Sequence, residues 1–369
     1  MSTNKIKIGV DVTGLIFHNQ VTGIERVIVE TNKYLLKILD PQIYEIHPFT
    51  TAPEREGNTQ IHPYLLSDPV FTKPMIDLHE CHILFFGGIN LNIPFKELLN
   101  FKQNKNLKIL TIVHDILPLT HPEWFQLPPT STEHPRKISS KNYFQVYLQA
   151  MFALSNQVVL VSEHVKNEIY QLGWNLKPNI AVVPLGTFAS NNAAAKPSPN
   201  GLHSVYVSTI TPRKGHEELL AAFDLLWNEG FDITLTLIGY ASWGVESFLK
   251  KIETHPMKDK KLFWKSHLVD WQVDEIYAST DIAFSVSEGE GFGLPLEEGL
   301  SKGLKVIARD IPVFRERDYP NLYFFKGAAQ ELSEKIREVS VLPTKPLGPN
   351  EIRTMESFAN EVAQLIKLL

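Results

Sequence analysis

The sequence predicts an α/β protein with two consecutive domains, each built on a parallel sheet with helices on both faces. Short apolar runs suited to buried strands alternate with amphipathic helical stretches along the whole chain. The chain has 369 residues, whereas a single hydrophobic core stops growing at about 250 to 300 residues. Residues 187–202 are rich in Ala, Ser, Asn and Pro and lie between the two series of strands. They therefore predict a linker.

The composition excludes several classes of protein. Hydrophobic residues make up 43% of the chain and charged residues 21%, which indicates a globular protein. The formal net charge is −5, so we expect no nucleic-acid partner and at most weak peripheral contact with a membrane. No apolar run is long enough for a signal peptide or a membrane span, which favours a cytoplasmic protein, at most peripheral at the inner membrane face. The single cysteine, Cys81, lies in an apolar run, which favours a core position over a catalytic thiol.

The first domain is expected to span residues 1–186. A helix with apolar residues at helical spacing is predicted over 22–39, another over 136–155, and a third after the N-cap residue Ser162. Residues 53–74 predict loops around a weak strand. The expected strands are residues 5–12, 44–50, 82–88, 107–115, 157–161 and 180–186.

Candidate site residues of this domain lie where strands end. Gly14 and Gly23 lie on the connection that leaves the first strand, where open α/β sheets bind ligands, although ordinary turn chemistry would also explain them. His114 and Asp115 follow another strand, and an imidazole there could donate to a sugar hydroxyl or support proton transfer. Three aromatic residues on the helix 136–155 are expected in the core rather than in a sugar platform: Tyr143, Phe144 and Tyr147.

The second domain is expected over residues 203–350 and begins with a strand, a polar turn and an amphipathic helix. The turn carries Arg213 and Lys214, and two adjacent cations at a strand's carboxyl end suit a diphosphate. A solvated surface pair is the alternative. Gly239 marks a glycine loop after the next strand.

The stretch 287–310 combines a strand end, a glycine loop and a helix start. Gly291 and Gly293 allow the backbone to approach a ligand, and Pro295 suits the first helical turn, whose amides attract anions such as phosphate. Glu290 and Glu298 have seven residues between them and suit hydroxyl groups rather than phosphate. The combination predicts a sugar-phosphate or nucleotide site, unless Glu298 is an ordinary solvated helix glutamate.

The run EGFGLPLEE, residues 290–298, resembles the nucleotide-sugar site of the retaining GT-B glycosyltransferases of family 4, the glycosyl transferases group 1. The resemblance continues through residues 299–316 and is densest over 204–316. It implies two Rossmann-like domains facing each other across a cleft. The nucleotide sugar would bind mainly to the second domain and the acceptor to the first, and a C-terminal helix, residues 351–369, would cross back to the first domain.

The same resemblance implies a role for each candidate residue. Arg213 and Lys214 would stabilise the leaving diphosphate, Glu290 would bind the transferred sugar, Glu298 the ribose, and His114 the sugar near the reacting carbon. His114, Glu290, Arg213 and Lys214 are the candidate catalytic residues. The remaining candidates for donor binding are Gly14, Gly23, Gly239, Gly291, the amides of Phe292, Gly293 and Leu294, and the base-contacting backbone of Phe263, Trp264, Lys265 and Ser266.

The implied reaction moves a hexose from a nucleoside diphosphate sugar to a hydroxyl of a glycan or lipid-linked glycan, with retention of the anomeric configuration. No cofactor or metal is expected, since the chain contains no Asp-x-Asp pair. The runs TGIERV and HDILPLTHPEWF are most similar to bacterial mannosyl- and rhamnosyltransferases of surface polysaccharide synthesis, which favours GDP-mannose over UDP- and dTDP-sugars. A GT-B epimerase or phosphorylase, and a sugar-nucleotide-binding protein without turnover, remain as alternatives.

Overall fold

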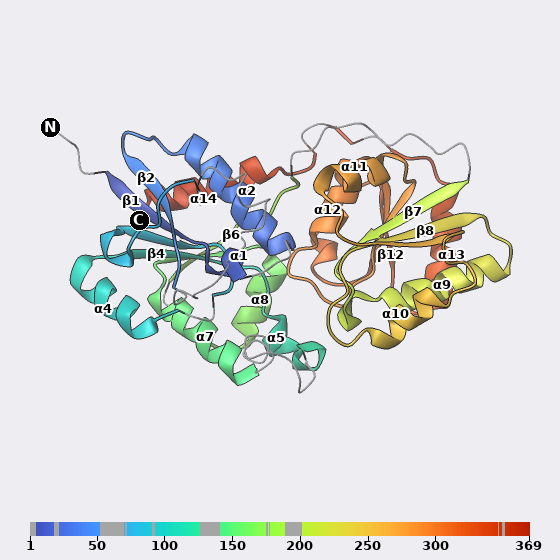
Figure 1. Ribbon diagram of the computed structural model, residues 1–369, viewed down its shortest axis with the longest axis horizontal. Coiled ribbons are helices and arrows are strands. Elements are labelled where there is room, and N and C mark those ends of the chain that lie inside the picture. The colour runs from blue at the N-terminus through green and yellow to red at the C-terminus, as the bar shows by residue number, and fades with distance from the viewer. Residues whose placement is uncertain are drawn as a thin grey trace. The chain divides into compact units, whose positions relative to one another are not determined.

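The protein divides into two compact units, each with its own sheet (Figure 1). The first unit comprises Met1–Pro122, Glu133–Gly186 and Arg353–Leu369, and the second Glu123–Thr132 and Thr187–Ile352. Most of the expected loop region 53–74, most of the linker 187–202 and the expected helix start at 136–140 lie outside the described residues. The computed structural model describes residues 5–17, 22–51, 70, 72–90, 93–125, 141–174, 176, 178–188, 201–345, 347–348 and 351–369.

In the described part of the first unit, six strands form one parallel sheet in the order β2-β1-β3-β4-β5-β6. The chain runs from β1 to β2 on one side and then returns to place β3 on the other side of β1. The switch point between β1 and β3 is where open α/β sheets bind ligands. The strands are β1 (Ile6–Asp11), β2 (Tyr44–Phe49), β3 (Ile83–Phe86), β4 (Lys108–Val113), β5 (Gln157–Leu160) and β6 (Asn179–Val182).

The described part of the second unit also holds a six-stranded parallel sheet, in the order β12-β11-β10-β7-β8-β9. Here the chain goes from β7 to β8 and β9 on one side, then to β10, β11 and β12 on the other. The switch point therefore lies between β7 and β10. The strands are β7 (Leu202–Val207), β8 (Ile233–Ile238), β9 (Leu262–Lys265), β10 (Ile282–Ser285), β11 (Lys305–Arg309) and β12 (Leu322–Phe325).

Side-chain caps fix the start of several helices. Ser162 accepts a hydrogen bond from the amide of Val165 at 3.1 Å, which confirms the predicted cap.

The helices of the first unit are α1 (Thr13–Phe17), α2 (Gly23–Ile38), η1 (Leu78–Glu80), α4 (Phe95–Lys105), α5 (Leu117–Thr120), α7 (Lys141–Leu154), α8 (Glu163–Gln171) and α14 (Met355–Lys367). Those of the second unit are η3 (Pro212–Lys214), α9 (His216–Asn228), α10 (Glu246–Glu253), α11 (Asp270–Ala278), α12 (Leu294–Ser301), η4 (Phe314–Glu316) and α13 (Ala329–Ser340). The short helix η2 (Pro122–Phe125) belongs to both units, because Pro122 is assigned to the first and the rest of the helix to the second.

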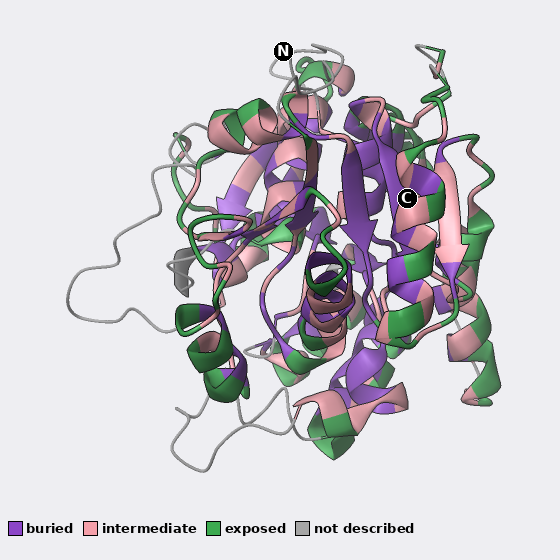
Figure 2. Ribbon diagram, turned by 90° about the vertical axis from the view of Figure 1, so that its right-hand side faces the viewer, coloured by how far each residue is buried: buried purple, intermediate pink, exposed green. Residues whose placement is uncertain are grey.

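Apolar side chains cover both faces of the second sheet. One cluster packs α9, α10 and α13 onto one face, and another packs α11, α12 and η4 onto the opposite face. Figure 2 shows the inner strands largely in purple, the colour of buried residues, because both of their faces are covered, whereas the edge strand β12 is mostly of intermediate burial. Among the described residues, no helix combines the length and the apolar character that crossing a bilayer requires.

The aromatic residues of α7 lie mostly in the core of the first unit. Phe144 and Tyr147 are buried, as predicted, whereas Tyr143 is 36% exposed. Tyr143 and Phe144 are adjacent, so they point in directions about 100° apart around the helix and cannot both face the sheet.

Cys81 is buried, and burial raises the pKa of its thiol to about 12.

The C-terminal helix α14 packs against α2 of the first unit, and the two lie side by side in Figure 1. Its buried face includes Phe358, Val362 and Ile366. The expected return of the chain to the first domain is thus confirmed. The turn before α14 lies directly against Gly186, where an added Cβ would stand 2.2 Å from the carbonyl oxygen of Thr354.

Gly186→Ala is expected to lower the free energy of unfolding by about 2 to 4 kcal/mol, because the methyl group overlaps rigid backbone. Gly173→Ala is the matched control, since its Cβ would meet no atom within 4 Å and only its φ of +69° opposes the change. That control should lose only about 1 kcal/mol. Urea unfolding of both variants measures the difference, and equal losses would contradict a close contact at Gly186.

Candidate active site

Four predicted segments of the second unit lie on one edge of its sheet. The strands are parallel, so the residues that follow β7, β8, β9 and β10 leave the sheet at the same edge. Arg213 and Lys214 follow β7, Gly239 follows β8, Ser266 follows β9 and Glu290 follows β10. Because β7 and β10 are neighbours at the switch point, the two cations and Glu290 come together although Lys214 and Glu290 are 76 positions apart in the sequence.

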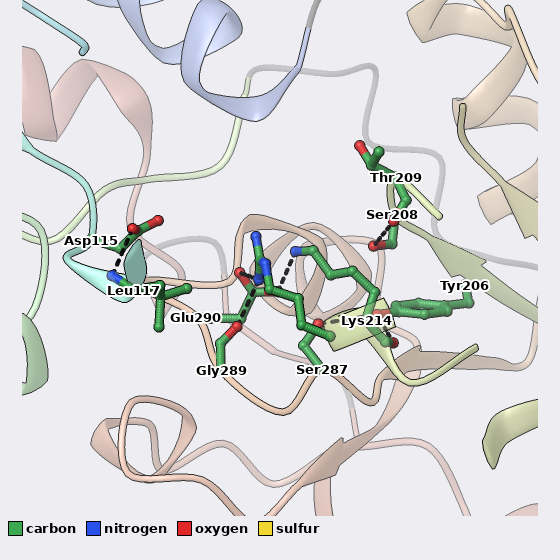
Figure 3. Close-up of polar contacts among 10 residues, drawn as sticks. Asp115, Leu117, Tyr206, Ser208, Thr209, Lys214, Ser287, Gly289 and Glu290 are labelled. Atoms are coloured by element: carbon green, nitrogen blue, oxygen red, sulfur yellow. Dashed lines mark hydrogen bonds and ion pairs between the residues drawn. The ribbon is translucent and has the colours of Figure 1, made fainter. Parts of the chain in front are cut away.

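Glu290 is paired with both cations. Lys214 donates through Nζ to Oε1 of Glu290, and Figure 3 shows its side chain extended toward the carboxylate. Arg213 Nη1 lies 3.5 Å from Oε2 of Glu290 and donates to the carbonyl of Gly289 at 2.7 Å. The three side chains are only 14% to 16% exposed. Arg213 and Lys214 are therefore not a solvated surface pair.

The cations keep Glu290 ionised. Burial alone would raise the pKa of this carboxyl, but the charges of Lys214 and Arg213 outweigh burial and hold its pKa at about 2. In the structure the carboxylate thus neutralises part of the positive charge beside the start of α12. An incoming anion would compete with Glu290 for the same two side chains.

Acid should weaken the protein through this group. A carboxyl whose pKa is depressed on folding contributes stability that is complete above its unfolded pKa of about 4.5 and is lost as the pH falls toward 2. We expect the wild type to lose on the order of 3 kcal/mol more than Glu290→Gln between pH 6 and pH 2. Urea unfolding of both proteins across this range measures it, and parallel pH profiles would show that the pairing does not stabilise the fold.

A buried tyrosine joins the two halves of the site. The hydroxyl of Tyr206, in β7, donates to the carbonyl of Lys214 at 2.8 Å and lies 3.1 Å from Oγ of Ser287, after β10. Burial raises the pKa of this phenol, so it stays protonated. The amide of Glu288 also donates to the carbonyl of Arg213 at 2.9 Å. Sequence reasoning missed Tyr206; its only signal is a polar-tipped aromatic residue inside an apolar strand.

Residues 290–294, here named the donor loop, precede and open α12. Gly293 has a φ of +96°, a left-handed conformation that glycine adopts without strain, and caps the helix. Helix-start amides have no intrahelical acceptor, so those of the N-cap Gly293 and the first helical residue Leu294, together with that of Phe292 directly before them, suit an anion. Glu298 is buried one turn further on, which excludes an ordinary solvated glutamate.

The loops after β8 and β9 are joined to each other. The amide of Gly239 donates to the carbonyl of Lys265 at 3.0 Å, and Trp264 Nε1 donates to the carbonyl of Gly239 at 3.0 Å. An added Cβ on Gly239 would lie 2.0 Å from the carbonyl oxygen of Ser208. Backbone packing therefore requires glycine at this position. The predicted base-contacting segment, residues 263–266, lies on the edge strand β9 and directly after it.

His114 belongs to the first unit and follows β4. Its Nε2 lies 2.7 Å from the carbonyl oxygen of Gly87, which can only accept, so the neutral ring carries its proton on Nε2. Burial lowers the pKa of His114, which favours this neutral form. Nδ1 is then an acceptor, so in this form the ring would accept from a sugar hydroxyl rather than donate to it. Asp115 accepts from the amide of Leu117 at 3.1 Å and shapes the turn that follows.

A buried polar network lies at the switch point of the first unit. Asp11 accepts from the amide and hydroxyl of Thr13 at 3.0 and 2.6 Å, and its other oxygen accepts from Nδ2 of Asn90 at 2.8 Å. Sequence reasoning missed Asp11 and Asn90. The network fixes the start of α1, which contains Gly14. Gly23 opens α2 beside a capping box made by Thr22 and Glu25, which gives its position a structural reason.

These features suit a phosphorylated ligand with hydroxyl groups. Two cations, three amides and two carboxylates of the second unit come from segments next to its switch point. Among the described residues, no three His, Cys, Asp or Glu side chains are grouped so as to hold a metal ion. Arg213 and Lys214 are the two cations that lie beside Glu290.

Comparison with known proteins agrees with this geometry. Residues 191–347 match the family model of the glycosyl transferases group 1. The serotype-specific mannosyltransferase WbdA of Escherichia coli is 30% identical over 358 residues, 90% of this chain and 41% of that protein. A second WbdA sequence of Escherichia coli is 34% identical over 247 residues, 62% of this chain and 29% of that protein. The chain thus spans well under half the length of these relatives.

Solved structures share the fold over nearly the whole chain. Anabaena HepE, solved with UDP and glucose, has a TM-score of 0.63 at 18% identity. The alignment covers 98% of this chain and 95% of the HepE chain. Sucrose-phosphate synthase from Thermosynechococcus elongatus has a TM-score of 0.62 at 15% identity, covering 98% and 94%. Residues 191–347 are therefore similar to the glycosyl transferases group 1, and the fold of the chain is GT-B.

Proposed function

We propose that the protein is a retaining glycosyltransferase that moves a hexose from a nucleoside diphosphate sugar to a hydroxyl of a glycan or lipid-linked glycan acceptor. The observation that carries the proposal is Glu290, a carboxylate held between Arg213 and Lys214 beside the start of α12. We further propose GDP-mannose as the donor and surface polysaccharide as the product. Support comes from relatives of about 30% identity that are named mannosyltransferases.

In the proposed reaction the site stabilises charge on the leaving group. The bond between the anomeric carbon and the diphosphate oxygen breaks, and negative charge grows on that oxygen. Arg213, Lys214 and the amides of the donor loop would stabilise this charge. These groups would already be in position before the reaction, and such preorganised electrostatic stabilisation is usually the largest contribution to catalysis. The diphosphate would replace Glu290 as the partner of the two cations. The Glu290 carboxylate would then accept hydrogen bonds from hydroxyls of the transferred sugar.

The proposed route delivers the acceptor on the face from which the diphosphate leaves. The acceptor oxygen bonds to the anomeric carbon, and its proton passes to the departing phosphate oxygen, so the configuration is retained. A double displacement would require a carboxylate on the opposite face of the sugar. Glu298 would bind the ribose hydroxyls, and His114 would accept through Nδ1 from a hydroxyl of the sugar.

A nucleotide screen followed by product analysis tests the proposal. GDP should raise the melting temperature more than UDP, dTDP or ADP, because a ligand at 100 times its dissociation constant adds about 2.7 kcal/mol to the free energy of unfolding. A shift with UDP or dTDP instead would replace the donor. No shift with any of the four would contradict a nucleotide site. NMR of the product formed with the donor that binds then gives the anomeric configuration, and inversion would overturn the retaining route.

Turnover is expected to continue in EDTA. Arg213 and Lys214 supply the positive charge that a divalent cation supplies in other transferases. Initial rates measured with and without chelator, after dialysis against EDTA, should agree within about twofold. Loss of turnover that added Mg²⁺ or Mn²⁺ restores would show that the two side chains do not suffice.

A further inference from the structure

The donor loop rests on the turn that follows β11. An added Cβ on Gly293 would lie 2.4 Å from the ring of Phe314, a buried residue of η4. The guanidinium of Arg317, the residue after η4, lies 4.2 Å from the ring centre of Phe292. One short turn therefore supports two consecutive residues of the donor loop, each through a flat side chain.

Arg317 is also tied to α12. Its Nε donates to Oε1 of Glu297 at 2.8 Å, and its Nη1 donates to the carbonyl of Val313. The side chains of Arg317 and Glu297 are each 6% exposed. One guanidinium thus contacts the loop, the helix that the loop opens, and its own turn.

Burial of the Arg317–Glu297 ion pair costs desolvation free energy, and a gain in folding stability does not explain why the pair is present. Among the described residues, Nη2 of Arg317 is buried and has no hydrogen-bond partner. Glu297 lies beside Tyr319, and burial together with the charge of Glu297 raises the pKa of that phenol to about 12. A buried ion pair repays its desolvation only when its remaining polar atoms are satisfied, and an apolar pair of similar size is often as stable or more so. The guanidinium lies over the ring of Phe292 and is anchored by Glu297, which offers a reason for keeping both charges.

We propose that Arg317 is a positioning residue that fixes the backbone of Phe292 and Gly293 at the start of α12. A planar cation stacked on an aromatic ring restricts the ring, and Glu297 restricts the cation. The amides of Phe292 and Gly293 are thereby held where they face an anion. This inference rests on the proposed function only in naming that anion as the diphosphate of the donor.

Arg315 provides a matched control two residues earlier. It pairs with Asp310 through Nε at 2.6 Å and Nη2 at 2.8 Å, and its guanidinium lies 3.9 Å from the ring centre of Phe324. The same turn thus carries a second arginine with an ion pair and a stacked ring, directed at Phe324 in β12. Arg315→Met removes the same kinds of interaction without touching the donor loop.

The first test requires no ligand. In hydrogen exchange of the unliganded full-length chain, Arg317→Met should speed exchange of the peptide 290–296 about tenfold, and Arg315→Met should change it less than twofold. Arg317→Lys, which keeps a charge near Glu297 but loses the flat stacking, should give an intermediate rate. If Arg317→Met does not fold, Glu297→Leu/Arg317→Met, which leaves no unpaired charge, replaces it. Equal exchange in the Arg317 and Arg315 variants would overturn the proposal.

The second test connects the loop to the donor. GDP and UDP titrations should show a dissociation constant about tenfold higher for Arg317→Met and unchanged for Arg315→Met. In the transfer assay the KM for the donor should rise, while the KM for the acceptor stays constant. Normal nucleotide affinity in Arg317→Met would overturn the link to the donor. If the wild type binds neither nucleotide, the proposed function fails, and the exchange experiment still decides whether Arg317 positions the loop.

Discussion

Glu290→Gln is expected to lower kcat by about 100-fold or more while nucleoside diphosphate affinity stays equal or increases. In the structure the carboxylate pairs with the same two cations that the proposed diphosphate requires. Glutamine preserves the shape but removes that competing charge, so the anion should bind no less tightly. The substitution also removes the negative charge and replaces one of the two acceptor oxygens by an amide group that only donates, so hydroxyls of the sugar are bound less strongly and turnover falls. Isothermal titration with GDP and UDP, combined with initial rates, separates the two quantities.

Glu298→Gln is the comparison for that result. Glu298 lies in α12, eight positions after Glu290, and the proposed partner of its carboxylate is the ribose. This variant should raise the dissociation constant of the nucleotide and affect kcat less. Similar changes in both quantities for both variants would show that the roles of the two carboxylates are divided wrongly.

Lys214→Met is expected to reduce kcat/KM by about 1,000-fold, because it removes a charge that stabilises the leaving diphosphate. It also leaves Glu290 with Arg213 as its remaining cation. A buried ion pair that loses one partner destabilises a protein by about 3 to 5 kcal/mol, so the protein must be assayed well below its melting temperature. Initial rates against donor concentration, together with urea unfolding, measure both effects.

Lys302→Met controls for lost stability. Lys302 is buried at the end of α12 and pairs with Asp274 at 2.8 Å, away from the donor loop. Its substitution should cost a similar amount of stability and leave kcat/KM within a few-fold of the wild type. If both lysine variants lose activity in proportion to their stability, Lys214 acts through the fold and not on the diphosphate.

Periodicity in the sequence predicted most of the fold. Alternating apolar runs and helical stretches correspond to parallel strands and helices in both units because each run must bury its apolar side chains. Ser162 was predictable as a helix cap because capping depends on residues three apart. Phe358, Val362 and Ile366 recur at helical spacing in the last helix and lie on its buried face, and this helix packs on α2. Each of these features is local, or depends on a repeating pattern.

The motif around Glu290 was also legible in the sequence, since a glycine loop, a proline and two carboxylates are consecutive there. Its pairing with Lys214 was not, because strand order, not sequence distance, makes β7 and β10 neighbours. The sequence suggested that His114 donates to a sugar hydroxyl, but the carbonyl of Gly87, directly after β3, determines which nitrogen of the ring carries the proton. No sequence pattern marked Tyr206 or Arg317, whose roles depend entirely on what they touch.

The sequence alone thus determined the strands, the helices and the segment in which an anion site can form. Only the tertiary structure decided the charge state of Glu290, the tautomer of His114 and the support of the donor loop by Arg317. The division has a physical reason. Secondary structure follows from neighbours along the chain, whereas the ionisation and orientation of a side chain follow from charges, dipoles and rings that folding brings within a few ångströms of it.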